Sequence, residues 1–141
     1  GSSPEDDIRM FINPYFMPGF AGKFKKSFVN AAHGIAFLFK SQPNARIELT
    51  ITVLVLLSGI FFKISAAEWC IILLCIALVI GFEGINTALE VLADKLHPGV
   101  NKEIGLAKDV AAGAVLITAL VAAIVGFIIF APRLLELWIN R

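Results

Sequence analysis

The sequence predicts an all-α integral membrane protein, with three transmembrane helices and an N-terminal amphipathic helix that lies on the membrane surface. Of the 141 residues, 58% are hydrophobic, and the mean hydropathy of +0.84 is far above that of soluble globular domains. The apolar residues gather in three long stretches without a polar face, whereas each helix of a soluble bundle needs one. The length corresponds to a single domain.

The first predicted element is an amphipathic helix within residues 22–41, GKFKKSFVNAAHGIAFLFKS. At a helical period its phenylalanine and aliphatic side chains share a broad face, and most of its lysines fall outside that face. Such a helix lies in the interface with its lysines toward anionic head groups; the alternative is an ordinary surface helix packed on protein. The first three residues, GSS, are expected to remain from an expression tag, and residues 4–20 are expected to be loosely ordered.

Three apolar stretches predict the membrane spans, and they are Leu49–Phe62, Trp69–Phe82 and Val110–Pro132. Only the third reaches the roughly 20 apolar residues that cross a bilayer. The first two reach this length by including polar residues, backward past Glu48 and forward through Gly81–Lys95. We expect one domain over residues 21–131 and a short amphipathic tail over residues 132–141.

Basic residues set the orientation of the spans. They are frequent before the first span and between the second and third, whereas the connection between the first and second spans holds only Lys63. We therefore expect a multi-pass protein of the cytoplasmic (inner) membrane, whose N-terminus and second connection are cytoplasmic. Lys63 and Glu68 should be solvated charges on the outer side.

Several residues within the spans have expected structural roles. Cys70 and Cys75 are expected to be buried thiols that behave as small hydrophobes, rather than a disulfide or a metal site. Trp69 should anchor its helix at the outer interface. Glycines are expected to allow close helix packing, and these are Gly59, Gly81, Gly113 and Gly126.

Polar residues interrupt the second span at one end. Glu83, Glu90 and Asp94 lie within about 40° of one another around a helix axis, in a stripe about 16 Å long with Asn86 on its flank. A carboxylate near the bilayer centre costs about 2.5–3.5 kcal/mol on insertion scales, and three together repel one another. A hard divalent cation with oxygen ligands would offset this repulsion, and Mg²⁺ usually arrives with substrate phosphates, which Lys108 could meet.

Three interpretations are compatible with these residues. The first is a membrane enzyme that handles a phosphorylated, metal-bound cosubstrate at the cytoplasmic face. The second is a cation or proton pathway, because carboxylates within membranes also mark transport. The third is a structural subunit whose acids pair with Arg46 and Lys108. The chain contains neither GxxxxGK[ST] nor GxGxxG, so neither common nucleotide fingerprint applies.

The stretch EGINTALEVLAD, from Glu83 to Asp94, resembles the signature of the prokaryotic diacylglycerol kinase family, which includes the undecaprenol kinases. AKDVAAGAVL, from Ala107 to Leu116, resembles the second block of that family, and NARIE at Asn44–Glu48 fits as well. The resemblance covers about residues 20–131. It implies a homotrimer that transfers the γ-phosphate of Mg-ATP to the hydroxyl of a membrane lipid alcohol. The active site is expected near the cytoplasmic interface and shared between protomers, with no nucleic-acid partner.

The resemblance also implies roles for individual residues. Glu83 matches the catalytic base that takes the proton of the lipid hydroxyl, and Asn86 would orient it or the acceptor. Glu90 matches the carboxylate that holds the metal. The nucleotide would lie beside residues that include the Lys–Asp pair of the second block, and these are Lys23, Asp94, Gly99, Val100, Asn101, Lys108 and Asp109.

Gln42 departs from the family pattern, because many members have Glu there as a second metal ligand. An amide oxygen can still bind Mg²⁺ but brings no charge, so metal affinity should fall; Glu48 is a possible substitute. A catalytically impaired member of the family is therefore an alternative. The sequence of the second block, AKDVAAGAVL, resembles that of the undecaprenol kinase branch, which weakly favours a polyprenol over diacylglycerol as the acceptor.

Overall fold

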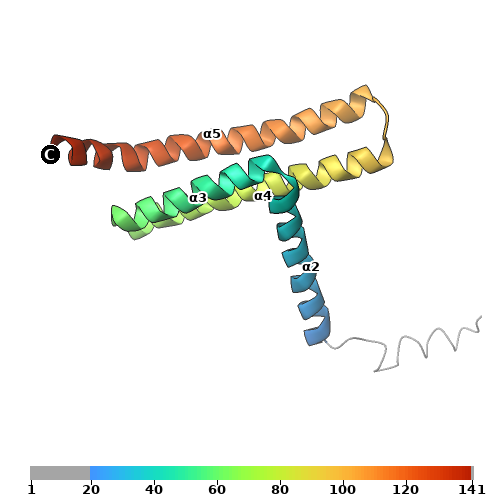
Figure 1. Cartoon of the computed structure of the whole chain (residues 1–141), viewed down its shortest axis with the longest axis horizontal. Helices are drawn as coiled ribbons and strands as arrows, with labels where there is room; N and C mark the ends of the chain where they lie inside the picture. The colour runs from blue at the N-terminus through green and yellow to red at the C-terminus, as the bar shows by residue number, and fades with distance from the viewer. Residues whose placement is uncertain (1–19, 141) are drawn as a thin grey trace, which may run out of the picture. The chain divides into compact units, whose positions relative to one another are not determined.

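The structure is a computed structural model that describes residues 20–140. This part of the chain is helical without strands, in the order α2 (Phe20–Ser41), α3 (Pro43–Phe61), α4 (Ala66–Leu96) and α5 (Lys102–Ile139) (Figure 1). The all-α fold class predicted from the sequence is confirmed. The segment expected to be loosely ordered lies outside the described residues, apart from Phe20, which begins α2.

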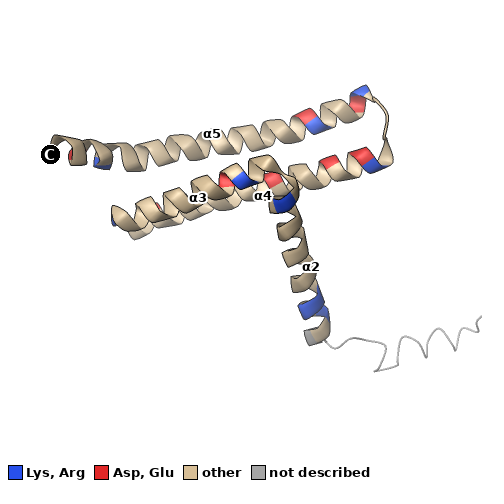
Figure 2. Cartoon of the chain, viewed as in Figure 1, with Lys and Arg blue, Asp and Glu red and all other residues tan. Residues whose placement is uncertain are grey.

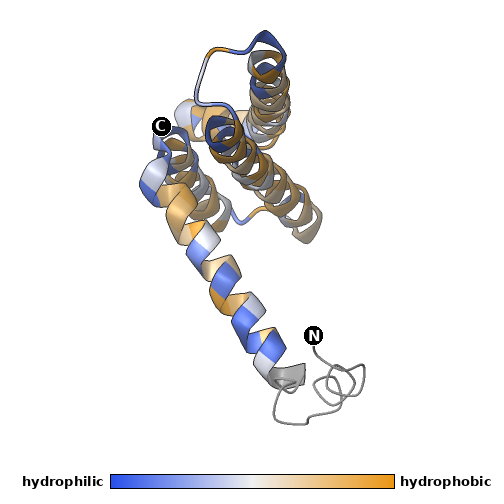
Figure 3. Ribbon diagram, turned by 90° about the vertical axis from the view of Figure 1, so that its right-hand side faces the viewer, coloured by the Kyte–Doolittle hydropathy of each residue, from blue (hydrophilic) through white to orange (hydrophobic). Residues whose placement is uncertain are grey.

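The chain divides into two units, one ending at Phe37 and the other beginning at Leu38, and each is described by itself. The first unit contains most of α2, along which polar and apolar residues alternate at the helical period (Figure 3). The rings of Phe24 and Phe28, one turn apart, lie with their centroids 5.7 Å apart, as residues four apart on one helix face do. The predicted amphipathic helix is therefore present.

The second unit contains three helices that are long and apolar enough to cross a membrane. With 19, 31 and 38 residues, they are about 28, 46 and 57 Å long at 1.5 Å per residue. Since the hydrocarbon core is about 30 Å thick, α4 and α5 extend beyond it. Helix α5 continues through Pro132, so residues 133–139 of the expected tail belong to the same helix.

Helix α4 is the centre of this unit, and it packs most extensively against α5 and less against α3. The three helices run side by side in Figure 1. Toward the loop that joins α3 and α4, Ile64, Ile72 and Ile129 form a small buried core. Most other large apolar side chains of the described residues remain exposed, as on proteins whose surface meets a membrane or a further chain.

Gly59 is the glycine that confirms the expectation of close packing. A Cβ atom on Gly59 would lie 2.7 Å from Cη2 of Trp69 and 2.9 Å from Cζ2, so the indole ring rests on the backbone of α3. A Cβ atom on Gly81, Gly113 or Gly126 would meet no atom within 4 Å among the described residues. These three glycines therefore do not mark close helix contacts within a single chain.

The two cysteines are free thiols, so the expectation that they form no disulfide is confirmed. Cys75 is partly buried, but Cys70 is exposed, and the expectation that it is buried was wrong. The other described helices of a single chain therefore do not cover the Cys70 side chain.

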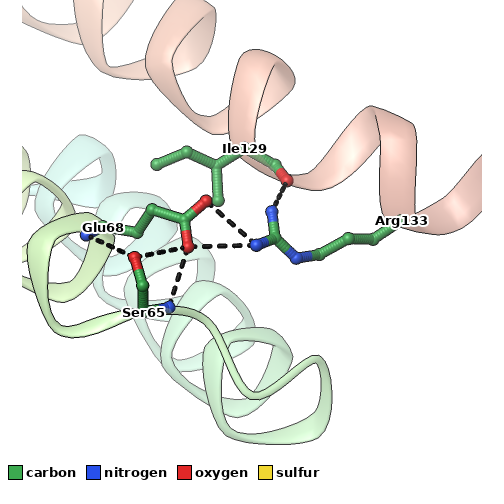
Figure 4. Close-up of polar contacts among 4 residues, drawn as sticks. All are labelled: Ser65, Glu68, Ile129 and Arg133. Atoms are coloured by element: carbon green, nitrogen blue, oxygen red, sulfur yellow. Dashed lines mark hydrogen bonds and ion pairs between the residues drawn. The ribbon is translucent and has the colours of Figure 1, made fainter.

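Glu68 is not the solvated charge that we predicted. Its backbone N–H donates to Oγ of Ser65 at 3.3 Å, and the N–H of Ser65 donates to its Oε2 at 2.8 Å. This reciprocal capping box begins α4. The carboxylate also accepts two hydrogen bonds of 3.0 Å from Nη2 of Arg133 on α5 (Figure 4).

Arg133 also supports the helix around Pro132. Its Nη1 donates a hydrogen bond to the carbonyl of Ile129 (Figure 4). Pro132 has no N–H to donate to the carbonyl of Ile128, four residues earlier, and the hydrogen bond from Arg133 goes to the next carbonyl of the same turn. The Arg133 guanidinium therefore joins α4 to α5 and adds a hydrogen bond within the turn that precedes Pro132.

Candidate functional site

The polar face of α4 is the centre of the candidate site. Glu83 is 2% exposed, Thr87 4% and Asn86 8%, whereas most of α4 is far more exposed. Together with Glu90 these residues stand at positions i, i+3, i+4 and i+7, which lie on one side of a helix. Figure 2 shows that most charged residues of α4 and α5 gather toward the loop that joins these helices.

The carboxylate of Glu90 brings α3 and α4 together. It accepts a hydrogen bond from Nδ2 of Asn86 at 3.3 Å, one turn earlier on α4. It also accepts one from Nε2 of Gln42 at 3.4 Å. Gln42, which is distant in the sequence, thus lies beside Asn86 and Glu90, and all three were expected at the site.

Gln42 can reach Glu90 because of its place at the corner between α2 and α3. It is the N-cap residue of α3, but its side chain makes no capping hydrogen bond and is free to extend toward α4. The corner is held by Arg46, whose Nε donates to the carbonyl of Phe39 at 3.1 Å and whose Nη2 donates to that of Lys40 at 2.6 Å. Arg46 therefore satisfies the last carbonyls of α2 instead of pairing with the acids of α4.

Three buried polar atoms at this site have no hydrogen-bond partner among the described residues, and they are Oε2 of Glu48, Oδ1 of Asn86 and Oγ1 of Thr87. An unsatisfied buried polar group costs about 1–3 kcal/mol, so such atoms indicate a place where a further group binds. Thr87 was not among the residues that the sequence analysis expected at the site. Its position, four residues after Glu83, was the available signal.

The carboxylates of the site are close enough to repel one another, since Glu83 interacts electrostatically with both Glu48 and Glu90. Within the described residues, no three His, Cys, Asp or Glu side chains are grouped so as to hold a metal ion. The available oxygen donors are instead the carboxylate of Glu90, to which Asn86 and Gln42 present their amide nitrogens, and the Oδ1 atom of Asn86. These are the hard oxygen donors that Mg²⁺ prefers, and the unpartnered Oδ1 of Asn86 fits this chemistry.

Lys108 pairs with Asp94 across the two helices. The distance from its Nζ to Oδ1 of Asp94 is 2.9 Å, and the two side chains are 34% and 70% exposed. Two residues that were expected beside the nucleotide are thus in contact with each other. The interpretation as a structural subunit also expected Lys108 to pair with an acidic residue. Asp109 is exposed one residue further along α5.

The loop between α4 and α5 holds the remaining expected nucleotide residues of this unit. Gly99 and Val100 are exposed there. Asn101 caps α5, because its Oδ1 accepts hydrogen bonds from the N–H groups of Glu103 at 2.9 Å and Ile104 at 3.2 Å. Lys23 belongs to the other unit, where it is exposed on α2.

Comparison with known proteins identifies the family. The family model described as prokaryotic diacylglycerol kinase matches residues 29–130. The chain belongs to the prokaryotic diacylglycerol kinase family. The family resemblance drawn from the EGINTALEVLAD and AKDVAAGAVL blocks is thereby confirmed.

Two relatives in this kinase family show how far the similarity extends. The chain is 37% identical over 116 residues to the undecaprenol kinase of Bacillus subtilis (strain 168), which covers 79% of this chain and 91% of that one. It is 36% identical over 114 residues to the diacylglycerol kinase of Synechocystis sp. (strain ATCC 27184 / PCC 6803 / Kazusa), covering 80% of this chain and 65% of that protein. No solved structure matches the chain.

Proposed function

We propose that the protein is a lipid kinase of the cytoplasmic membrane that transfers the γ-phosphate of Mg-ATP to the hydroxyl of a membrane lipid alcohol, undecaprenol or diacylglycerol. Family membership supports the reaction class. The observation that supports the site is the buried face of α4, where Glu83 and Asn86 lie one turn apart. The nearly equal identities to the two relatives, 37% and 36%, do not separate the two acceptors.

In this proposal the tasks of the reaction are divided among the polar residues of α4 and Gln42. Phosphoryl transfer depends mostly on positioning the reactants and neutralising their charge. Glu83 therefore needs only to accept the proton of the lipid hydroxyl, late in the transfer. Asn86 holds the carboxylate of Glu90 in place through its Nδ2. Glu90, with Gln42 and the free oxygen of Asn86, would hold Mg²⁺, which when bound supplies positive charge to the phosphates.

The nucleotide is proposed to bind on the α4–α5 loop side. Lys108 would exchange its hydrogen bond to Asp94 for contact with a phosphate, and Asp94 would remain beside the nucleotide. Asp109 and the loop residues complete the proposed nucleotide site in this unit, whereas a role of Lys23 stays a prediction from the family resemblance. We further propose that the N-terminus and this site are cytoplasmic, and that three copies of the chain assemble with each site shared between protomers.

The test is phosphate transfer from labelled ATP by the purified protein in detergent or bilayers, with undecaprenol and diacylglycerol offered side by side. The variant Glu83→Gln should lower turnover by about 10²–10⁴-fold, which is the usual contribution of a general base. The matched control is Glu136→Gln, which makes the same change at an exposed carboxylate near the end of α5 and should leave turnover unchanged.

The outcomes separate the alternatives. Label in one lipid, lost only in Glu83→Gln, supports the kinase and names its acceptor. Unchanged turnover in Glu83→Gln removes this residue from the mechanism. Ion flux through liposomes without ATP consumption would favour a cation pathway instead. Label in neither lipid, restored by Gln42→Glu, would indicate a member of the family that is impaired at its metal site.

A further inference from the structure

Helix α5 continues beyond the connection that joins α3 to α4 (Figure 1). The connection meets α5 at two points. The rings of Phe62 and Phe130 lie with their centroids 6.2 Å apart, and Ile64 shares a buried core with Ile129. Helix α5 ends at Ile139. It therefore extends about 13 Å past Phe130 along its axis, at 1.5 Å per residue.

The extension of α5, residues 133–139, is amphipathic, and its apolar side is uncovered. At about 100° per residue, Arg133, Glu136 and the following Asn140 share one side of the helix, and the apolar residues cover the broader opposite side. Arg133 contacts Glu68 of α4, so the apolar side points away from the helices of its own chain. Its side chains are 49–77% exposed, and they are Leu134, Leu135, Leu137, Trp138 and Ile139.

The connection between α3 and α4 satisfies its own backbone donors. The N–H groups of Phe62, Lys63 and Ile64 donate to carbonyls of α3 at 2.9, 3.2 and 3.2 Å, and the N–H of Ser65 donates to Oε2 of Glu68 at 2.8 Å. In hydrocarbon, where no water can bond to it, a backbone N–H must find its partner within the protein. The N–H groups of this connection therefore do not require water.

The ion pair beside the connection is satisfied in the same way. Both carboxylate oxygens of Glu68 accept from Nη2 of Arg133 at 3.0 Å, and Oε2 also accepts from the hydroxyl of Ser65 at 2.9 Å. The guanidinium donates a further hydrogen bond to the carbonyl of Ile129 (Figure 4). Ionisable residues within membranes pair with one another or with backbone carbonyls, and Arg133 does both.

The thickness of a bilayer distinguishes two placements of α5. A hydrocarbon core of about 30 Å corresponds to about 20 residues of a helix. If one edge of the core were level with Phe130, at the connection, the other edge would be at Val110. If one edge is level with Ile139, the other is at Ala119. The first placement leaves the apolar extension outside the core, whereas the second includes it.

The position of Glu48 favours the second placement. Residues 48–55 of α3 and 119–126 of α5 line one cavity, and these two helices run in the same direction, so Glu48 is level with Ala119. The first placement would put its carboxylate about 13 Å inside the core, where a charge is costly. The second puts it at the edge. The segment of α5 then left outside is rich in small residues with little apolar area, which are Ala107, Ala111, Ala112, Gly113 and Ala114.

We propose that acyl chains of the leaflet on the side of the connection cover the apolar side of the extension, and that the hydrocarbon core reaches Ile139. The α3–α4 connection and the pair of Glu68 with Arg133 then lie inside the bilayer rather than at its surface. Trp138 becomes the residue at the interface, where Trp is enriched. The long side chain of Lys63 extends its ammonium toward the head groups. The inference does not depend on the proposed kinase activity.

The two tryptophans of the chain allow their depths to be measured in nanodiscs, which leave both bilayer faces open to water. Trp69→Phe leaves Trp138 as the fluorophore, and Trp138→Phe leaves Trp69, which lies in the first turn of α4. Quenching by phosphatidylcholine brominated near the head group or near the chain end would be compared with quenching by iodide. Trp138 should be quenched best by bromine near the head group. Trp69 should be quenched best by bromine near the chain end, and iodide should not quench it.

A pair of cysteine variants tests the connection directly. In the background Cys70→Ser with Cys75→Ser, Phe61→Cys places a thiol beside the connection at a residue that is 69% exposed, and Asn140→Cys places one just after α5. In nanodiscs a charged maleimide should label Asn140→Cys readily and Phe61→Cys many-fold more slowly. In denaturant both should label at the same rate. Ile60→Cys, at a residue that is 66% exposed, repeats the measurement if Phe61→Cys does not fold.

The other outcomes each overturn the inference. Quenching of Trp138 by iodide, with rapid labelling of Phe61→Cys, would place the extension and the connection in water. Quenching of Trp69 mainly by bromine near the head group would place the edge of the bilayer at the connection. Quenching of Trp138 by neither lipid nor iodide would mean that a second copy of the chain or another protein covers the extension. Phosphate transfer enters none of these measurements, so the kinase proposal is tested separately.

Discussion

The contact between Gly59 and Trp69 gives a prediction whose magnitude follows from the structure. In Gly59→Ala the new Cβ atom would lie 2.7 Å from Cη2 of Trp69 and 3.1 Å from Cδ1 of Ile64. Carbon atoms pack best at about 3.5–4.0 Å, so the indole ring must move by close to 1 Å. Overpacking of this kind costs about 1–3 kcal/mol, and the better helix propensity of Ala returns up to about 1 kcal/mol. The net loss of unfolding free energy should be about 0–3 kcal/mol.

The assay is equilibrium unfolding in mixed detergent micelles, arranged as a double-mutant cycle with Trp69→Leu, which removes the ring atoms that the new Cβ meets. In that background Gly59→Ala should become neutral or stabilising, so the coupling should be about 1–3 kcal/mol, within the range for residues in contact. The matched control is Gly113→Ala, whose Cβ meets no described atom within 4 Å. If Gly59→Ala is equally destabilising in both backgrounds, the ring is not the obstacle and the reasoning is wrong.

Three further predictions concern polar contacts. Gln42→Glu puts a second carboxylate 3.4 Å from Glu90, so it should lower the melting temperature in EDTA and increase the stabilisation by Mg²⁺; an identical Mg²⁺ titration would argue against a metal between them. Thr87→Val removes a buried hydroxyl that has no described partner, so unfolding free energy should stay equal or rise by up to about 1 kcal/mol while turnover falls; a clear loss of stability would show that the hydroxyl is satisfied within the protein. Arg133→Met removes both hydrogen bonds to Glu68 and should lower the melting temperature more than Arg133→Lys, which keeps the charge; equal effects would mean that the two-bonded geometry does not matter.

The three spans and the polar face of α4 could be predicted from the sequence because each depends on local order alone. Uncharged apolar stretches must span the bilayer, and the helical period places Glu83, Asn86 and Glu90 close together around α4. The capping box at the start of α4 was also readable, since Ser65 is followed three residues later by Glu68. Treating Glu68 as a loop charge concealed this signal.

Contacts between distant residues could not be predicted in the same way. The hydrogen bond from Gln42 to Glu90 joins residues 48 positions apart, and it depends on how Arg46 holds the corner before α3. The hydrogen bonds from Arg133 to Glu68 join residues 65 positions apart, and they require that α5 continue through Pro132. Sequence rules place a helix boundary at such a proline. The hydrophobic periodicity does not show that α5 continues beyond it, because the contact between Arg133 and Glu68 joins two helices.

The two ion pairs between α4 and α5 have a consequence for the lengths of these helices. Glu68 and Asp94 are separated by 26 residues on α4, and their partners Arg133 and Lys108 by 25 residues on α5. At 1.5 Å per residue these separations are about 39 and 38 Å, so the spacing of charges on one helix matches that on the other. Inserting or deleting one residue between the pairs would shift one end by about 1.5 Å and turn it by about 100°, and both pairs could not then form together. Over this stretch the number of residues is constrained independently of their identity, so apolar substitutions should be tolerated where single-residue insertions and deletions are not.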